Sequence, residues 1–351
     1  MLDIKALIKE ASEKGASDIH IYAGESPRFR IKGELISSGY EKLTPGDTLE
    51  VLLYLMDPVQ RAIFEEKKEA DLSVSIPEAG RIRVNAYRQR GSITITLRLV
   101  DSEIPEAGTL GIPENVLELC EERKGLILIT GPSGSGKSTV TASLIDRINS
   151  ERSCNIITLD DPIEFYFKNK KAIVNQREIG VDTIDLSTAL ESCLKQDPDV
   201  IGLGSIHSEE GAEAAIMAAE TGRLVFASLY TAGAARTISY LIDMFPEQKR
   251  RQAANRLSNV LTAVLSRQLI RSGDDEMIPV YELLLNDNAV REMIRDNKTE
   301  ELTRYMEENK EKGLSTMDGS IYSLCIEGRI SKEEAVLASS DREAMAERLL
   351  N

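Results

Sequence analysis

Along the first hundred residues, short segments in which apolar and polar residues alternate are interleaved with segments of helical spacing. The apolar positions of residues 3–15 and 48–66 recur at the spacing of one helix face. Gly33 and Gly91 fall at expected turns. Alternating segments, which predict strands, cover residues 17–22, 27–32, 71–76, 81–88 and 92–100. We therefore predict an N-terminal α+β domain over residues 1–100.

The pattern changes after residue 100. Residues 101–113 contain two prolines and two glycines, which predict a linker. Over residues 114–351, apolar strands, loops and helices follow one another, which is typical of a parallel sheet covered by helices. The candidate strands are residues 125–130, 154–159, 200–203 and 224–229, and the remainder is expected to be mostly helical. This part of the chain is therefore predicted to be an α/β domain.

Composition narrows the possible functions. The 351 residues include 43 Lys and Arg against 58 Asp and Glu, so the formal net charge is −15. Because phosphates would be repelled by such a chain, we expect no nucleic-acid partner. No apolar run approaches the roughly 18 residues that a membrane span needs, and we expect a cytoplasmic protein. The four cysteines are far apart in sequence and form no CxxC pair, which argues against a zinc site.

One segment carries a phosphate-binding pattern. Residues 131–139 read GPSGSGKST, which matches G-x-x-x-x-G-K-[ST] between a predicted strand and an apolar helix. Glycines let backbone N–H groups turn toward phosphate oxygens, and the helix N-terminus carries partial positive charge. Lys137 would reach the β- and γ-phosphates, and the Ser138 hydroxyl would be a ligand of Mg²⁺. The predicted nucleotide-binding residues are Gly131, Pro132, Ser133, Gly134, Ser135, Gly136, Lys137, Ser138 and Thr139.

Acidic residues at the carboxyl ends of parallel strands can reach a bound metal or water. Asp160, Asp161 and Glu164 follow the predicted strand 154–159, so one of them could hold Mg²⁺ through water or orient the attacking water. The alternative is that they are surface acids that cap a helix.

The next predicted strand, residues 200–203, ends differently, because it is followed by Gly204 and Ser205 where P-loop enzymes usually carry an acid. Asp197 and Asp199 precede this strand, so they are expected at the opposite edge of the sheet and cannot replace that acid.

Further motifs are spread over the chain. They lie at residues 15–20 (GASDIH), 81–91, 161–165 (DPIEF), 174–178 (VNQRE), 197–199, 218–222, 243–246 (DMFP) and 289–296 (AVREMIRD). With these motifs and the phosphate loop, the chain closely resembles the type IV pilus retraction ATPases, the PilT branch of the secretion ATPase superfamily, over nearly its whole length. Residues 289–296 look like the motif typical of the retraction branch.

The resemblance implies a homo-hexameric ring, in which each subunit joins an N-terminal PAS-like domain to a RecA-like P-loop ATPase domain. Such a ring would use ATP and Mg²⁺ to pull pilin subunits back through an inner-membrane platform protein, and would be peripheral at the inner membrane. ATP would lie between the two domains. In such families two arginines of the N-terminal domain reach the γ-phosphate, and the matching positions are Arg83 and Arg98.

The sequence departs from the family where chemistry is expected. The family motif Gly-Glu-Met-Arg-Asp is replaced by residues 204–208, Gly-Ser-Ile-His-Ser. The two histidines of the family's His box align with Arg223 and Tyr230 of this chain. A glutamate of the family that precedes Asp161 is replaced here by the shorter Asp160. A serine cannot accept a proton near neutral pH, and loss of a positioned base typically costs about 10²- to 10⁴-fold in rate. His207 either takes over part of that function or is a surface imidazole.

Two hypotheses therefore stay open. The first is a retraction motor that hydrolyses ATP slowly, with Asp160, Asp161 or Glu164 in place of the lost glutamate. The second is a catalytically silent ATP-binding module that regulates or assembles with an active paralogue. A third hypothesis, a general secretion or competence ATPase, is disfavoured by the retraction-like motif at residues 289–296.

Overall fold

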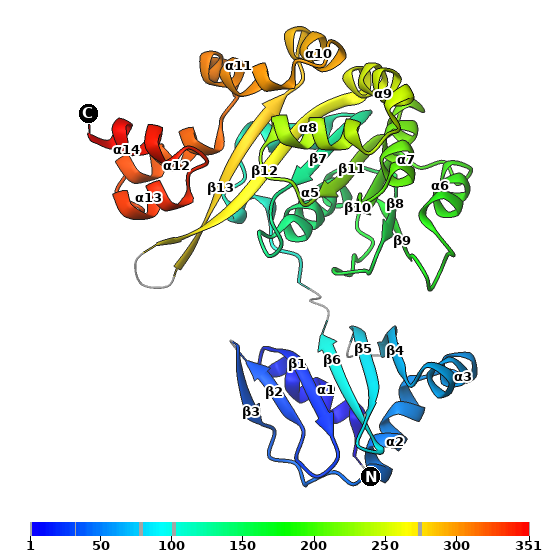
Figure 1. The fold of residues 1–351 in the computed structure, drawn as a ribbon. Coiled ribbons are helices and arrows are strands. Elements are labelled where there is room, and N and C mark those ends of the chain that lie inside the picture. Colours follow the sequence, from blue (N-terminus) through cyan, green and yellow to red (C-terminus); the bar gives the residue numbers. More distant parts are fainter. Residues whose placement is uncertain (1, 32, 77–79, 100–102, 273–275, 351) are drawn as a thin grey trace. The chain divides into compact units, whose positions relative to one another are not determined.

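The computed structural model describes residues 2–31, 33–76, 80–99, 103–272 and 276–350. The chain divides into two compact units (Figure 1). The first comprises Met1–Glu103 with the short segment Glu164–Tyr166, and the second comprises Ile104–Ile163 with Phe167–Asn351. Each unit is built on its own sheet.

The sheet of the first unit has six strands in the order β3-β2-β1-β6-β5-β4, and all its neighbours are antiparallel. Its strands are β1 (Ala16–Tyr22), β2 (Arg28–Ile31), β3 (Glu34–Ser37), β4 (Glu69–Ile76), β5 (Gly80–Gln89) and β6 (Ser92–Leu99). Alternate residues such as Ile19, Ile95 and Val84 are buried, as the alternating pattern predicts. The predicted strand ends Lys32 and Val100 lie outside the described residues, and β3 was not predicted.

The helices of the first unit share one core with the apolar face of its sheet. They are α1 (Ile4–Glu13), α2 (Pro45–Leu55) and α3 (Pro58–Lys67). The prediction of a single helix over residues 48–66 is wrong, because the helix is interrupted at Met56 and Asp57. Asp57 caps α3 by accepting hydrogen bonds from two backbone N–H groups, and Pro58 stands at its first position, where proline is tolerated.

The sheet of the second unit has seven strands in the order β13-β12-β7-β11-β10-β8-β9. They are β7 (Gly125–Thr130), β8 (Asn155–Asp160), β9 (Ile173–Glu178), β10 (Val200–Ser205), β11 (Leu224–Leu229), β12 (Leu261–Ser272) and β13 (Glu276–Leu285). All pairs are parallel except β12 with β13. The carboxyl ends of the parallel strands therefore meet at one edge of the sheet.

The expectation that the remainder of this part is mostly helical is wrong at β9, β12 and β13. Most of β12 is buried between β7 and β13, so its apolar residues run almost continuously instead of alternating. Pro279 lies within β13 opposite Leu269. Proline is accepted there because β13 is the outermost strand of the sheet, where a missing backbone N–H need not be paired.

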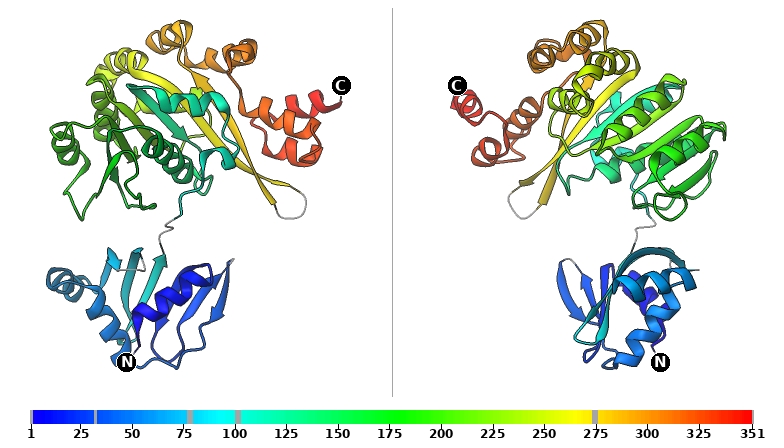
Figure 2. Two further views of the ribbon diagram at one scale, coloured as in Figure 1. Left: turned by 180° about the vertical axis from the view of Figure 1, so that it is seen from behind. Right: turned by 45° about the vertical axis from the view of Figure 1, so that its right-hand side comes forward.

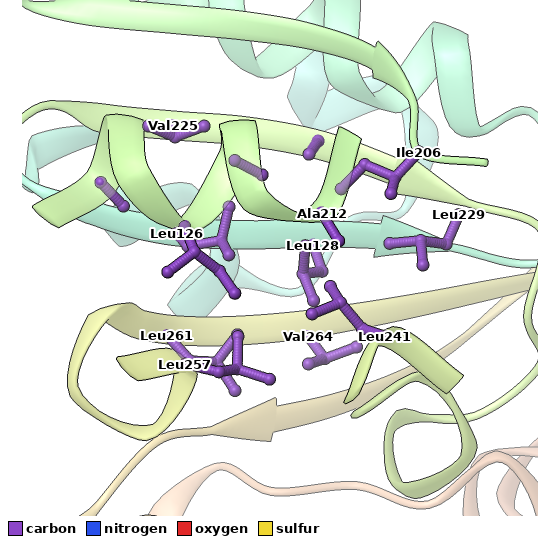
Figure 3. Packing of buried hydrophobic residues seen from close by; sticks show 14 of the residues in the cluster. Leu126, Leu128, Ile206, Ala212, Val225, Leu229, Leu241, Leu257, Leu261 and Val264 are labelled. Carbon is purple, nitrogen blue, oxygen red and sulfur yellow. The ribbon is translucent and has the colours of Figure 1, made fainter. Parts of the chain in front are cut away.

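Helices cover both faces of the second sheet. One face packs against α6 to α11 in a large apolar cluster, part of which is shown in Figure 3. Helices α4 and α5 belong to the other face, and α12 to α14 pack on the ends of β12 and β13 (Figure 2). The helices are α4 (Glu114–Glu118), α5 (Lys137–Glu151), α6 (Leu186–Leu194), α7 (Glu209–Glu220), α8 (Ala234–Asp243), α9 (Glu247–Val260), α10 (Asn288–Arg295), α11 (Leu302–Glu308), α12 (Met317–Ile326), α13 (Lys332–Ala338) and α14 (Arg342–Leu350).

The segment predicted as a linker, residues 101–113, is described only in part, because residues 101 and 102 lie outside the described residues. From Ile104 onward the segment is grouped with the second unit. Ala107 and Ile112 are buried there, and the Pro105 carbonyl accepts a hydrogen bond from the Ser143 hydroxyl.

None of the helices among the described residues has the length and apolar character needed to cross a membrane. In that same part of the chain, no three or more His, Cys, Asp or Glu side chains gather in a way that could hold a metal ion.

Candidate functional site

The phosphate-loop segment lies where β7 ends and α5 begins. All six residues of β7 are buried, so the loop starts from a fixed position in the middle of the sheet. Gly134 and Gly136 have φ angles of 76° and 82°, a region that favours glycine. The sequence context predicted for this motif, a buried strand followed by a helix, is present.

The side chains of the loop differ in exposure. Lys137 is only 6% exposed, and its Nζ donates hydrogen bonds of 2.9 Å to each of the Gly131 and Pro132 carbonyl oxygens. Ser135 is buried, whereas Ser138, in the first turn of α5, is half-buried. A cationic Nζ and the N-terminus of a helix thus stand at one loop, which is the arrangement that binds phosphate.

The neighbouring strands bring further polar groups to the same edge of the sheet. Ser205, the last residue of β10, has its Oγ 3.0 Å from the Oγ of Ser228 in β11. Asp160 ends β8, and its Oδ2 accepts a hydrogen bond of 2.5 Å from the Thr158 hydroxyl. Asp161 follows and is exposed. At the end of β10 the structure therefore holds a pair of hydroxyls where the resemblance would place a carboxylate.

Asp199 lies at the opposite edge, as predicted. It immediately precedes β10, and its Oδ2 accepts a hydrogen bond of 2.8 Å from the backbone N–H of Asn155, the first residue of β8. Neither Asp199 nor Asp197, two residues before it, can therefore reach the carboxyl ends of the strands.

The two positions aligned with the His box lie at opposite ends of β11. Arg223 precedes the strand and donates hydrogen bonds to the Thr221 and Pro198 carbonyl oxygens. Tyr230 follows the strand, and its ring centroid is 4.1 Å from Lys137 Nζ. The same ring stacks on His207 with centroids 5.5 Å apart and planes 15° apart. The Tyr230 ring thus contacts both Lys137 of the phosphate loop and His207, which follows β10.

The loop that carries Tyr230 is anchored by a buried carboxylate. Glu282 of β13 accepts hydrogen bonds from the backbone N–H groups of Ala234, at the start of α8, and Met317, at the start of α12. Burial raises the pKa of Glu282 above its ordinary value, although these two hydrogen bonds oppose the shift. The Gly233 N–H also donates to the Ser266 hydroxyl. The chain after Tyr230 is therefore fixed to the β12–β13 pair.

The two arginines predicted to reach a γ-phosphate lie in the first unit, directly opposite each other on β5 and β6. Arg83 makes two hydrogen bonds to Asp71, of 3.0 and 2.7 Å, and Arg98 Nε donates to Asp18 Oδ1 at 2.9 Å. The arginines thus share one polar face of the sheet, each oriented by its own carboxylate. The sequence interpretation did not identify these carboxylate partners.

The Asp18–Arg98 pair provides a prediction for stability. Burial raises the pKa of the Asp18 carboxyl, but hydrogen bonds from the Ser17 hydroxyl and the Arg98 guanidinium outweigh that effect and leave the pKa below its ordinary value. We expect Asp18→Asn to lower the free energy of unfolding by about 1–3 kcal/mol at neutral pH, because it removes the negative charge of a buried carboxylate that accepts hydrogen bonds from Ser17 and Arg98. Urea denaturation followed by circular dichroism measures the change.

The pH dependence and a control follow from the same pair. A depressed pKa stabilises the fold above the unfolded value of about 4, and this contribution is lost as pH falls through the folded value. The difference between wild type and Asp18→Asn should therefore shrink below about pH 4. Asp71→Asn is the matched control, because the Arg83–Asp71 pair is solvent-exposed and should contribute about 0–1 kcal/mol. Equal losses in the two variants would contradict the argument.

The predicted site residues are therefore divided between the two units. The phosphate loop, Asp160 and Asp161 are together in the second unit. Arg83, Arg98 and Glu164 are grouped with the first, and the Glu164 side chain is exposed.

One residue beside the loop was missed by the sequence interpretation. Arg267 of β12 donates a hydrogen bond of 2.9 Å to the Gly136 carbonyl oxygen, although 131 residues separate them. The segment around it was expected to be helical, so no sequence feature pointed to the loop. Only the parallel pairing of β12 with β7 places this arginine beside the end of β7.

A glycine-rich loop between a central buried parallel strand and a helix, with polar groups of the adjacent strands at the same edge, defines the class of P-loop α/β proteins. The family model described as "Type II/IV secretion system protein" matches residues 1–278. The chain belongs to this family and, within it, to the PilT family of type IV pilus retraction ATPases.

Individual relatives agree with this assignment. The type IV pilus retraction ATPase PilT of Pseudomonas aeruginosa is 35% identical over 95% of this chain and 97% of its own length. The type IV pilus ATPase PilU of the same organism is 34% identical over 97% of this chain and 89% of its own length. A crystal structure of the pilus retraction motor PilT with bound ADP superposes with a TM-score of 0.91, at 43% identity, over 98% of this chain and 99% of that one. The fold is thus an N-terminal domain followed by a RecA-like ATPase domain.

Proposed function

We propose that this chain is an ATP-binding subunit of a PilT-like homo-hexameric motor for type IV pilus retraction and twitching motility, with slow ATP hydrolysis. The observation that carries the proposal is the complete phosphate loop around buried Lys137. The solved PilT structure that superposes with this chain contains ADP, which supports a nucleotide at the corresponding loop.

The residues of the loop fit ATP and Mg²⁺. Gly134 and Gly136 have positive φ angles, which let backbone N–H groups of the loop turn toward phosphate oxygens. The Ser135 Oγ is buried without a hydrogen-bond partner among the described residues. The Ser138 hydroxyl, in the first turn of α5, would be a ligand of Mg²⁺, and Asp160 or Asp161 would act through water. A metal there would supply charge stabilisation to the transferring phosphoryl group.

The roles of the remaining residues are proposed from the same resemblance. Lys137 and the amides of the loop would bind the β- and γ-phosphates, and Arg83 and Arg98 of the N-terminal PAS-like domain would stabilise charge on the γ-phosphate. Asp160, Asp161 or Glu164 would orient the attacking water. We keep residues 1–100 and 114–351 as the two proposed domains, and we propose an inner-membrane platform protein as partner, with the ring peripheral at the inner membrane.

The second candidate function is a silent ATP-binding paralogue that regulates or assembles with an active motor. The specific observation that favours it is the Ser205–Ser228 hydroxyl pair at the end of β10, since neither group can act as a base near neutral pH. The chain is also about equally similar to PilT and to PilU of one organism, so identity alone does not separate two kinds of pilus ATPase.

Steady-state phosphate release from the purified full-length protein distinguishes the two functions. The motor is expected to release phosphate from ATP at a low rate that is clearly above that of Lys137→Ala measured beside it. The silent paralogue would bind ADP and ATP yet release phosphate no faster than that variant. Gel filtration with and without ATP tests the ring, and a protein that stays monomeric with ATP would contradict both functions.

A further inference from the structure

Arg267 adjoins the phosphate loop from the neighbouring strand. β12 pairs in parallel with β7, with Ser266 opposite Thr130, so Arg267 stands beside the point where the loop leaves the sheet. Its side chain crosses to the far end of the loop, where Nη1 donates a hydrogen bond of 2.9 Å to the Gly136 carbonyl oxygen. The residue is only 6% exposed.

Two glycines of the loop pack closely against this arginine. A Cβ atom on Gly131 would lie 2.2 Å from the Arg267 carbonyl oxygen, and one on Gly136 would lie 2.2 Å from Arg267 Nη1. Real Cβ atoms do not approach so closely. Gly131 is therefore required partly because the Arg267 backbone occupies the adjoining space. At Gly136 the neighbour is the end of the Arg267 side chain, so the positive φ of 82° is the stronger requirement for glycine.

The hydrogen bond from Arg267 also fixes the first turn of α5. The Gly136 carbonyl oxygen accepts from the Val140 N–H at 3.0 Å as well as from Arg267. In a trans peptide the C=O and the following N–H point in opposite directions, so the Lys137 N–H is directed away from these donors and out of the helix N-terminus. Backbone N–H groups with this direction are the ones that bind phosphate.

The charge of Arg267 has no carboxylate partner among the described residues. Its Nε is buried and makes no hydrogen bond within them, and its Cζ lies 5.6 Å from the centroid of the Tyr281 ring. Burial of a guanidinium without a counter-charge is costly for folding. The hydroxyls of Thr130, at the end of β7, and Ser135, within the loop, are also buried without partners in that part of the chain. This charge is thus available to an anion held by the loop.

We propose that Arg267 is a positioning residue of the phosphate loop. It holds the Gly136 carbonyl in place, and its buried positive charge stabilises a nucleoside polyphosphate bound at the loop. The inference rests on the proposed nucleotide binding and adds a second cation, from β12, to the loop's own Lys137. A purely structural arginine would stabilise the protein without ligand. Arg267 instead stabilises the complex, because the anion compensates its charge.

The test compares Arg267→Gln, Arg267→Met and Arg267→Lys in the full-length protein. We expect the neutral variants to raise the dissociation constant for ADP about 10-fold or more in calorimetric titration, and the lysine variant to raise it less than about 3-fold. The melting temperature without nucleotide should stay unchanged or rise in the neutral variants. Arg271→Gln is the matched control, since it removes the same charge from an exposed position of the same strand and should bind ADP as wild type does.

The outcomes are distinguishable. Arg267→Gln with wild-type affinity for ADP overturns the inference and leaves the proposed nucleotide binding intact. Affinity that falls in parallel with the melting temperature, in the lysine variant as well, shows a structural role and also overturns it. A wild-type protein that binds ADP no better than Lys137→Ala overturns the proposed function and this inference together.

Discussion

Lys137→Ala is expected to raise the dissociation constants for ADP and ATP by about 10- to 100-fold and to abolish any phosphate release. The Lys137 ammonium lies at the loop, buried, with two carbonyl oxygens and the Tyr230 ring around it. A charge-assisted hydrogen bond from such a group to phosphate is worth about 1.5–3 kcal/mol, and the buried position makes it stronger than it would be in water. Calorimetric titration with ADP and a phosphate-release assay measure the two effects.

The matched control is Lys124→Ala. Lys124 directly precedes β7 and is exposed, so its removal changes the net charge equally at the opposite end of the same strand. It should leave nucleotide affinity within about 2-fold of wild type. Thermal unfolding without nucleotide shows whether Lys137→Ala is folded, because the loop also loses two hydrogen bonds to Gly131 and Pro132. A folded Lys137→Ala that binds ADP like wild type would contradict the proposed function.

The parts of the fold that could be predicted are those in which burial leaves a simple pattern. Residues of the first sheet alternate because one face meets α1 and α2 and the other is polar, and its strands other than β3 were predicted within a few residues. The pair β12 and β13 was missed, because strand segments that are buried on both faces show the same continuous apolar pattern as a buried helix. Pro279 is also unfavourable for a strand in the interior of a sheet. Its position on the edge strand, where proline is accepted, is known only from the strand order.

The residues of the site likewise fall into those that could be predicted from the sequence and those that could not. The phosphate loop could be predicted because its chemistry is local: glycines, a lysine and a helix start within nine consecutive residues. Ser228 and Arg267 are distant in sequence from the loop, and only strand order brings β11 and β12 beside β7. Tyr230 was predicted as a replaced histidine, but its contact with Lys137 depends on the adjacency of β11 and β7. Contacts of this kind require the topology.

The Ser205→Glu, Tyr230→His double variant is expected to raise the rate of phosphate release by about 10²- to 10⁴-fold over wild type. Ser205 ends β10 beside the Ser228 hydroxyl, so a glutamate there would carry a carboxylate at the edge of the sheet that holds the phosphate loop. Histidine at position 230 removes the phenol that lies 4.1 Å from Lys137 Nζ and restores the family's residue. Steady-state phosphate release at saturating ATP measures the gain.

The matched control is Ser205→Gln with Tyr230→His, which has the same size and shape at position 205 but no carboxylate there. A rate equal to that of the glutamate variant would contradict the role of the carboxylate. The single variants should gain much less than the pair. Ser205 and Tyr230 terminate adjacent strands, and Tyr230 also contacts Lys137 and His207, so the two changes act on one set of contacts and their effects on the activation free energy should not add. A gain in the double variant that equals the product of the single gains would show instead that the serine and the tyrosine limit hydrolysis independently.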